Sequence, residues 1–477
     1  MGKPPQPLRQ SDVVFMHCAD RDAYRAYGAT FVAWGGTMTP ERVAEHHEAG
    51  LRCAGSMWCL TARAKLLHDR SDLREAVARD ITGEPVLVPW QFDATHRGTP
   101  TWFGCTNHPT FRQWTREQVR EVLTGKPDGL HVDDHLGTAT ASWLYGGGFC
   151  DHCMAAFRDY LRRHASPAEL ATAGVKRLEG FDYRSVVRAM ALSREEYLRT
   201  RQIIPLMHLF DRFQVEAAAE NLREIGELAT ELLGPDRLLS VNACLPWRHH
   251  LRAMEYATHA VGEVPQHANV GTTRSKEALL AYRAAEAMGK PLCATAHGWD
   301  WAYAKSHDLE ELVRYWIALA YAHGQRFMVP HPTRQWAYTP ELGQHGFVGR
   351  IEAFAPLYRF VRANAEYFDD YAAADADIEA PDTVIASLRS RPGRPDVLHI
   401  VNRDYVGNLG AGWRRKDAMR PAENVGAQIS GLGGAQRRRA TLLSYNAEPQ
   451  TVDIEATGDG LRLTIPELRL WTVAVLE

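Results

Sequence analysis

The sequence contains no long apolar run and little cysteine. No segment approaches the ~18 uninterrupted apolar residues of a membrane-spanning helix. The first residues, MGKPPQPLRQSDVVF, lack the apolar core of a signal peptide. Eight cysteines in 477 residues are too few for a disulfide scaffold. We therefore expect a cytoplasmic protein with reduced thiols and no membrane partner.

An excess of charge of either sign is also missing. The formal net charge is -3 and the pI is about 6.7. Lys and Arg are scattered along the chain, so the sequence does not predict a surface that follows a phosphate backbone, and we expect no nucleic-acid partner. Low-complexity tracts and long repeats are absent as well. The oligomeric state stays open, a homo-oligomer included.

Short apolar runs alternate with amphipathic, helix-like segments between residues 31 and 331. This alternation is typical of parallel strands joined by crossover helices, and eight such units predict a (β/α)8 barrel. The expected strands are FVAWGG (31–36), LRCAGSMWC (51–59), VLVPW (86–90), GLHVDD (129–134), LLSVNACLP (238–246), HAVGEVP (259–265), LCATAHG (292–298) and RFMVPH (326–331). The run VVFMHC (13–18) is an alternative first strand.

Two further segments depart from a simple barrel. About 100 helix-rich residues separate the fourth and fifth strands, which predicts a helical insertion over about residues 150–235. From about residue 379 the chain has short β-rich segments separated by Gly, Pro and Asn turns, as in an antiparallel β-sandwich. We expect a catalytic barrel over residues 1–378 and a β-sandwich domain over residues 379–477.

Carboxylates at strand ends are the strongest indication of chemistry, because active sites of (β/α)8 barrels form at the carboxyl ends of the strands. In the run LHVD, His131 and Asp133 share one face, so Asp133 should point into the site while Asp134 lies on the turn. Cleavage of a glycosidic bond requires two carboxyl groups. We expect Asp133 as nucleophile and Glu263, on the sixth strand, as acid/base. Asp134 has a turn or helix-capping role, or replaces Asp133.

Aromatic and polar residues follow the other strand ends. Indole faces bind sugar rings, and charged or amide groups bind the hydroxyls, so this combination predicts an oligosaccharide or glycoside substrate. The expected substrate-binding residues are His131, Trp34, Trp58, Trp90, Asp93, Trp247, His297, Trp299, Asp300, His331 and Trp336. For each of these residues a purely structural role in the barrel is the alternative.

Cys105, Cys150 and Cys153 are candidate ligands of a structural zinc ion. Cys150 and Cys153 form a CxxC motif, which can be half of a zinc site, a redox pair or two unrelated packing residues. Cys105 could supply a third thiolate, with His152 or His108 as a fourth ligand. Such a closed site would take no part in catalysis, for which we expect no cofactor.

These motifs resemble those of glycoside hydrolases of the (β/α)8 superfamily. The blocks CTNHPTFRQWTREQV, DGLHVDD and FCDHCMAAFRDYL are similar to family 42 β-galactosidases and related barrels, where cysteines matching Cys105, Cys150 and Cys153 bind structural zinc. Gly148 stands where that pattern has a further Cys, and no Glu follows strand seven as it does in those enzymes. The catalytic plan resembles instead family 66 dextranases and cycloisomaltooligosaccharide glucanotransferases, which have a similar DGxHxD-like segment and a C-terminal β-domain.

The sequence therefore favours a retaining glycoside hydrolase or transglycosylase. Two other functions stay open. One is a metal-dependent sugar isomerase, epimerase or lyase that uses Asp133, Asp134, Glu263, His297 and His331 as ligands. The other is a barrel that binds sugar without turnover.

Overall fold

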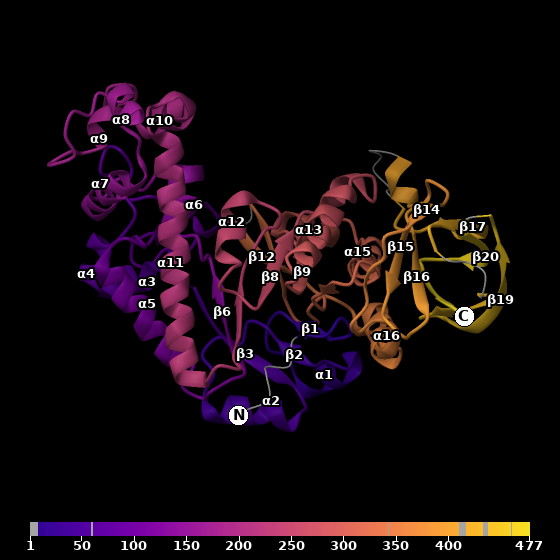
Figure 1. Cartoon of the computed structure of the whole chain (residues 1–477). Helices are drawn as coiled ribbons and strands as arrows, with labels where there is room; N and C mark the ends of the chain where they lie inside the picture. The colour runs from indigo at the N-terminus through magenta and orange to yellow at the C-terminus, as the bar shows by residue number, and fades with distance from the viewer. Residues whose placement is uncertain (1–7, 59–60, 342, 410–415, 433–436, 459) are drawn as a thin grey trace.

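The computed structural model describes residues 8–58, 61–341, 343–409, 416–432, 437–458 and 460–477. Eight parallel strands form a barrel in the order β1-β2-β3-β6-β7-β8-β9-β10 (Figure 1). The Val329 backbone N–H donates to the Val14 carbonyl oxygen over 2.8 Å and so joins the end of the last strand to the first. The strands are β1 (Val14–Phe15), β2 (Phe31–Val32), β3 (Arg52–Trp58), β6 (Gly129–Asp133), β7 (Leu238–Val241), β8 (His259–Val264), β9 (Leu292–Ala296) and β10 (Arg326–Phe327). The expected (β/α)8 barrel is confirmed.

Seven of the eight expected runs supply barrel strands, and VLVPW (86–90) does not. The alternative run VVFMHC supplies β1 in addition to FVAWGG, which supplies β2. Val86 and Val88 are buried in a small apolar cluster outside the barrel, and Pro89 begins a 3-10 helix, η1 (Pro89–Gln91). A proline has no N–H for a central ladder. With one strand added and one removed, GLHVD remains the fourth strand and HAVGEV the sixth. Cys59, at the end of another expected run, lies outside the described residues.

Crossover helices follow the amphipathic segments. Four of the amphipathic segments, at 40–50, 115–125, 274–289 and 310–324, form α2 (Pro40–Glu48), the later part of α5 (Pro109–Val122), α13 (Lys276–Ala287) and α15 (Glu310–Ala322). Apolar residues face the barrel because they recur at helical spacing. The remaining helices around the barrel are α1 (Arg21–Tyr27), α12 (Arg248–Ala253), α14 (Gly298–Ser306), α16 (Ile351–Ala363) and the 3-10 turns η3 (Ala268–Val270) and η4 (Ala365–Tyr367).

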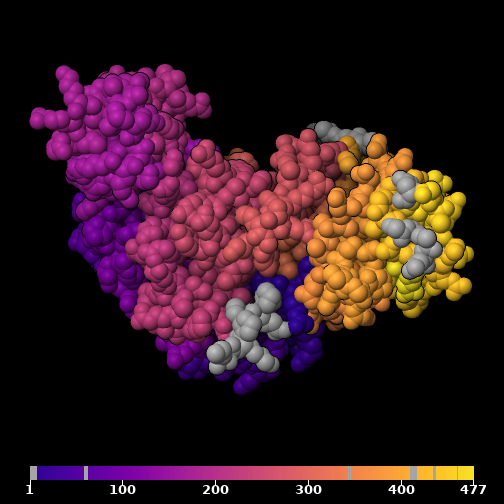
Figure 2. All heavy atoms as spheres, viewed as in Figure 1, coloured from indigo at the N-terminus to yellow at the C-terminus, as the bar shows by residue number. Residues whose placement is uncertain are grey.

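Two long connections change the shape of the barrel. Between β3 and β6 the chain forms β4 (Thr61–Ala62), α3 (Ala64–Asp69), α4 (Ser71–Glu75), η1 and β5 (Trp102–Phe103), and β4 pairs with β5. After β6 come α6 (Thr138–Tyr145), α7 (Asp151–His164), α8 (Pro167–Thr172), α9 (Arg184–Arg188), α10 (Arg194–Thr200), η2 (Arg201–Ile203) and the long α11 (Met207–Leu233). Helices α7 to α10 and the first part of α11 bury a separate apolar core and project from the barrel as the expected insertion (Figure 2). The last part of α11 packs in the barrel core through Leu222, Ile225 and Leu228.

The C-terminal part is a nine-stranded antiparallel β-structure with its own apolar core. Its strands are β13 (Ala372–Ala373), β14 (Asp377–Glu379), β15 (Val384–Ser390), β16 (Asp396–Asn402), β17 (Ala422–Ser430), β18 (Arg439–Ser444), β19 (Ala447–Ala456), β20 (Gly460–Leu468) and β21 (Trp471–Leu476), with η5 (Val406–Leu409) between β16 and β17. Before it, β11 (Gln335–Thr339) and β12 (Gly343–Phe347) form a hairpin next to α14. Among the described residues, no helix is long and apolar enough to cross a membrane.

Candidate active site

Asp133 is the last residue of β6, at the carboxyl end of the barrel strands. One carboxylate oxygen, Oδ1, accepts hydrogen bonds from the Asn242 side-chain amide and from the Asp134 backbone N–H, each over 3.0 Å. Asn242 follows β7 directly and lies beside Asp133 because Val132 and Val241 are register partners. Burial raises the pKa of Asp133, and these two hydrogen bonds and the Arg63 charge oppose that rise. Asp133 is therefore a half-buried carboxyl whose charged form is supported by three groups.

Glu263 lies near the end of β8, with a side chain that is 16% exposed. Burial, together with the charges of Asp133 and Asp300, raises the pKa of Glu263 to about 8. The imidazole of His297 lies close to this carboxyl, with its Nδ1 3.9 Å from Oε2 of Glu263, but burial lowers the pKa of that histidine and so disfavours a compensating positive charge. Glu263 consequently holds a proton at neutral pH, which is the state that a general acid requires.

Asp134 lies on the expected turn, and its backbone has the unusual φ of 50°. Its carbonyl oxygen accepts the Gly137 N–H over 3.0 Å. Burial and the charges of Asp133 and Glu263 raise the pKa of Asp134 well above its usual range. The carboxyl therefore belongs to the same electrostatic cluster as the expected catalytic pair, and the charges of Asp133 and Glu263 disfavour its ionisation.

A cavity of about 370 Å³ opens at the ends of β1, β2, β3 and β6. Trp58 stands beside Asp133 there, because the two residues are register partners on neighbouring strands. The cavity is lined by His17, Cys18, Trp34, Gly35, Gly36, Arg42, Ser56, Trp58, His131 and Asp133. Four expected site residues thus share one cavity, and its aromatic walls and single carboxylate suit a sugar ring.

His131 forms part of the wall of this cavity and is completely buried. Its Nδ1 pairs with the Ser240 hydroxyl over 2.9 Å, and its Nε2 has no hydrogen-bond partner. The centre of its ring lies 4.7 Å from the centre of the Trp34 ring. Burial lowers the pKa of His131 well below its usual range, with smaller contributions from neighbouring histidines. His131 is therefore held neutral by its surroundings, and its Nε2 is a buried nitrogen without a partner among the described residues.

Several site residues were missed by the sequence analysis. His17 and Cys18 line the cavity because VVFMHC forms the first strand, which the expected strand set omitted. Arg42 comes from α2, and its guanidinium donates to the Cys18 Sγ atom over 3.2 Å. The Arg63 guanidinium lies 3.8 Å from the centre of the Trp58 ring, a position set by the fold of the β3–β6 connection. Asn242 could have been found, because it is the polar residue that ends the run LLSV.

Asp300 and His331 have partners within the protein that favour structural roles. The Asp300 carboxylate accepts the backbone N–H groups of Gln266 and Ala268 over 2.8 and 2.7 Å. The Nε2 atom of His331 pairs with the Cys18 carbonyl oxygen, and its Nδ1 accepts from the Thr333 backbone N–H. Both residues are buried, so they hold loops at the barrel mouth in place.

The remaining expected residues lie away from the cavity. Trp90 belongs to η1 instead of a strand end and packs on Phe103 and Tyr145, and Asp93 is exposed. Trp247 is 45% exposed at the start of α12. Trp299 is exposed and stacks on Tyr338, which also stacks on Trp336 with ring centres 6.3 Å apart in each pair. These indoles form separate aromatic surfaces, the last of them on the β11–β12 hairpin.

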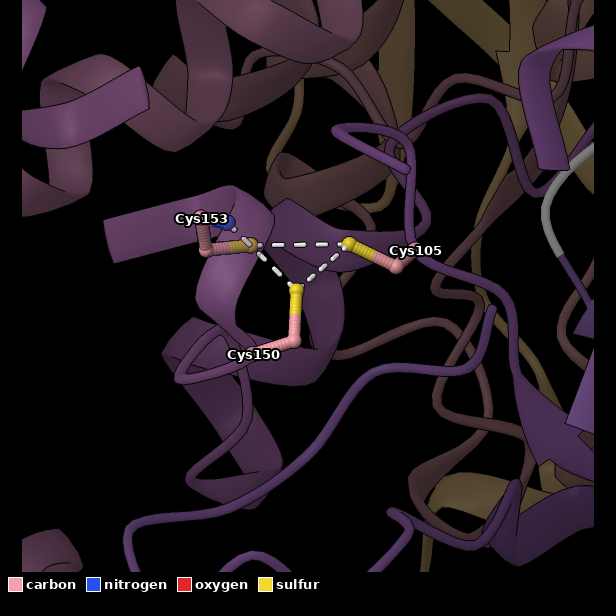
Figure 3. A group of neighbouring side chains, drawn as sticks. All are labelled: Cys105, Cys150 and Cys153. Carbon is pink, nitrogen blue, oxygen red and sulfur yellow. Dashed lines mark hydrogen bonds between the residues drawn. The ribbon is translucent and has the colours of Figure 1, made fainter. Parts of the chain in front are cut away.

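The three candidate zinc ligands converge in the core of the insertion. The Sγ atom of Cys105 lies 3.3 Å from that of Cys150 and 3.5 Å from that of Cys153 (Figure 3). Hydrogen bonds from the two other thiols lower the pKa of Cys150 to about 3. At Gly148, where a fourth Cys would stand, an added Cβ would lie 2.7 Å from the Gln214 amide nitrogen. The donor set, three thiols including one thiolate, fits zinc.

Comparison with known proteins finds similar enzymes, while no family model matches the chain. An α-agarase of Thalassotalea agarivorans is 24% identical over 278 residues, which are 56% of this chain and 18% of the agarase. The chain thus matches less than a fifth of that relative's length.

Solved structures confirm the fold at 10% sequence identity. The α-L-fucosidase isoenzyme 2 of Paenibacillus thiaminolyticus has a TM-score of 0.60, with 98% of this chain and 100% of that chain covered. A cycloisomaltooligosaccharide glucanotransferase of Paenibacillus sp. has a TM-score of 0.59, with 97% and 84% covered. The chain has the barrel-and-sandwich fold of these glycoside-processing enzymes, as the sequence resemblance implies.

Proposed function

We propose that the protein is a glycoside hydrolase or transglycosylase that acts on an oligosaccharide with retention of anomeric configuration. One observation carries this proposal. A carboxyl that holds its proton at neutral pH, Glu263, interacts electrostatically with a second carboxyl, Asp133, which lines a cavity with indole walls. Carboxyls whose environments differ in this way are the general acid and the ionised partner of a glycosidase, and we assign that partner, Asp133, as a nucleophile.

In the first step the Asp133 carboxylate attacks the anomeric carbon while Glu263 donates its proton to the leaving glycosidic oxygen. A glycosyl ester on Asp133 results, and Glu263 becomes a carboxylate. In the second step Glu263 removes a proton from water or a sugar hydroxyl, whose oxygen attacks the same carbon and releases Asp133. Asn242 and Arg63 stabilise the returning charge on Asp133.

The names of the similar proteins indicate which sugars to test as substrates. The similar proteins are named as an α-agarase, an α-L-fucosidase and a glucanotransferase. We propose that this chain also cleaves or transfers a glycosidic bond in an oligosaccharide. The metal-dependent alternative is less well supported, because both ring nitrogens of His331, one of its five ligands, already have hydrogen-bond partners.

The test is turnover of agar oligosaccharides and of aryl α-L-fucosides, α-glucosides and β-galactosides by wild type and Asp133→Ala. We expect turnover of at least one substrate by wild type and loss of it in the variant. Free azide should restore aglycone release in Asp133→Ala and yield a glycosyl azide. Turnover that survives in Asp133→Ala would contradict the assignment, and turnover that depends on added metal would favour the alternative.

We also propose that Cys105, Cys150 and Cys153 bind a structural zinc ion. The support is the convergence of the three Sγ atoms from α7 and from the loop that precedes α5. The ion would link these two segments within the core of the insertion. A water molecule, or a rotated His108 or His152, would complete four ligands.

A further inference from the structure

A second cluster of ligand-type side chains lies in the β3–β6 connection, away from the cysteines. His68 and Asp69 are the last residues of α3, and His96 belongs to a loop 27 residues later. One ligand atom of each of the three residues lies within 4.8 Å of the others. The catalytic carboxyls and the proposed zinc site do not involve these residues.

The segment that carries His96 is a tight turn. His96 and Thr99 exchange two backbone hydrogen bonds, each of 2.9 Å. The two residues between them, Arg97 and Gly98, have φ values of 49° and 81°, as a type I′ turn requires. The turn therefore holds His96 in a fixed position opposite Thr99, so the cluster does not depend on a loosely defined loop.

The same turn orients the second imidazole. The Nδ1 atom of His68 pairs with the Thr99 hydroxyl over 3.3 Å, and the two imidazole rings lie 5.2 Å apart. When Nδ1–H donates to this hydroxyl, the Nε2 lone pair of His68 is free. Metal-bound histidines are commonly oriented by such a hydrogen bond from the other ring nitrogen.

Asp69 supplies the negative charge of the cluster. Its carboxylate forms an ion pair with Lys65, one helical turn earlier, and is 45% exposed. A lysine at an exposed site is a weak competitor for a divalent ion, since exposed ion pairs contribute little stability. Asp69 can therefore exchange Lys65 for a metal ion.

We propose that His68, Asp69 and His96 bind a divalent transition-metal ion, with zinc as the best fit. Two imidazoles and one carboxylate are a common ligand set for zinc, and three protein ligands leave one position for water. The ion would cross-link the end of α3 to the turn. Because α3 begins directly after Arg63, which packs on Trp58 at the cavity, the ion would also fix the segment that carries Arg63.

The test is the number of zinc ions bound by metal-stripped protein in equilibrium dialysis. We expect wild type to bind one more ion than His96→Gln and His68→Gln. The matched control is His164→Gln, which changes an exposed histidine elsewhere and should bind as wild type does. Asp69→Asn, at an exposed position, should weaken the same ion at least tenfold without a change in the circular dichroism spectrum.

Cobalt distinguishes this ion from one held by the cysteines. The part of the cobalt absorption spectrum that disappears in His96→Gln should contain no sulfur-to-metal charge-transfer band. The same part of the spectrum should remain in Cys150→Ser. Equal stoichiometry and affinity in wild type and His96→Gln would overturn the proposal. So would loss of a component with thiolate character. Neither result depends on whether the protein cleaves glycosides.

Discussion

Glu263 and Asp133 carry carboxyl groups whose surroundings differ in how far they stabilise the charge. Asp133 accepts two hydrogen bonds and lies near Arg63, whereas Glu263 has beside it, at 3.9 Å, only a histidine whose pKa is lowered by burial. Burial dominates at Glu263 and keeps its proton in place up to about pH 8. In the proposed mechanism this difference makes Glu263 the acid and Asp133 the nucleophile.

The pH profile should report this proton. Because the pKa of Glu263 is raised to about 8, we expect kcat/KM to fall as the pH rises through about 8. Glu263→Gln should lose this limb and be slower by about 10²- to 10⁴-fold. The rates of both proteins on one aryl glycoside between pH 5 and 10 provide the measurement. With a leaving group that needs no proton, the rate of the first step should fall much less in the variant. An unchanged alkaline limb in Glu263→Gln would show that another group titrates.

The same carboxyl should lower the stability of the folded protein near neutral pH. A carboxyl whose pKa is raised on folding contributes stability that is complete below the unfolded pKa and is lost as the pH rises towards about 8. Glu263→Gln removes this penalty, so the variant should be more stable than wild type at pH 7, by up to roughly 3 kcal/mol, and similar at pH 4. Denaturant unfolding at the two pH values measures it. A variant that is less stable at pH 7 would contradict the buried, protonated state.

At the scale of elements, the loops at the barrel mouth depend on buried polar contacts. Asp300, in the first turn of α14, accepts two backbone N–H groups from the segment after β8. The sequence placed Asp300 correctly after β9 but could not show that its carboxylate was already used, because its partners come from another βα unit.

Asp300→Asn should therefore lower the stability of the protein and have little effect on substrate binding. Replacing a charged acceptor of two buried hydrogen bonds should cost about 2 kcal/mol, observed as a lower Tm with KM little changed. The neighbouring Trp299→Ala is the matched control, because Trp299 is 61% exposed and should leave Tm unchanged. A stable Asp300→Asn protein with a greatly increased KM would instead assign Asp300 to substrate binding.

The start of α7 should depend on metal. Cys150 is the N-cap of α7 and accepts the Cys153 backbone N–H over 3.4 Å. If zinc joins the three thiolates, purified protein should contain zinc that Cys150→Ser lacks, and chelation should lower the Tm of wild type only. Atomic absorption and thermal unfolding measure both quantities. Equal zinc content in wild type and Cys150→Ser would leave the three residues as packing thiols.

At the scale of the whole molecule, the barrel and the β-sandwich share a buried aromatic contact. Trp471 on β21 is 1% exposed and lies near Tyr321 of α15, Phe360 of α16 and Phe368. Figure 1 shows α15 and α16 between the barrel and the sandwich strands. This arrangement suggests that the two parts stabilise each other.

Trp471→Ala should consequently destabilise the whole chain. Loss of a buried Trp costs about 3–5 kcal/mol, and we expect barrel and sandwich to unfold together at a lower temperature in calorimetry. Phe92→Ala, at a half-exposed site, is the control and should unfold like wild type. Two separate unfolding transitions, of which Trp471→Ala shifts only that of the β-sandwich, would show that the two parts fold independently.

The barrel could be predicted from the sequence because its signal is repeated eight times. One expected strand, VLVPW, was wrong, and the first strand is VVFMHC instead. The two corrections cancel in the strand count, so Asp133 and Glu263 still lie at the ends of the fourth and sixth strands. Contacts made by loops could not be predicted. Arg63 and the pairing of His68 with Thr99 depend on where a long connection returns in space, and no local pattern encodes that.

Covalent trapping tests the central claim most directly. A 2-fluoro glycoside of the sugar that wild type turns over should accumulate as a glycosyl ester, since the fluorine slows its hydrolysis more than its formation. We predict that mass spectrometry of the digested protein places the added sugar on Asp133, and that Glu263→Gln with an activated leaving group forms the same adduct. An adduct on another carboxyl, or hydrolysis with inversion and no adduct, would contradict the account.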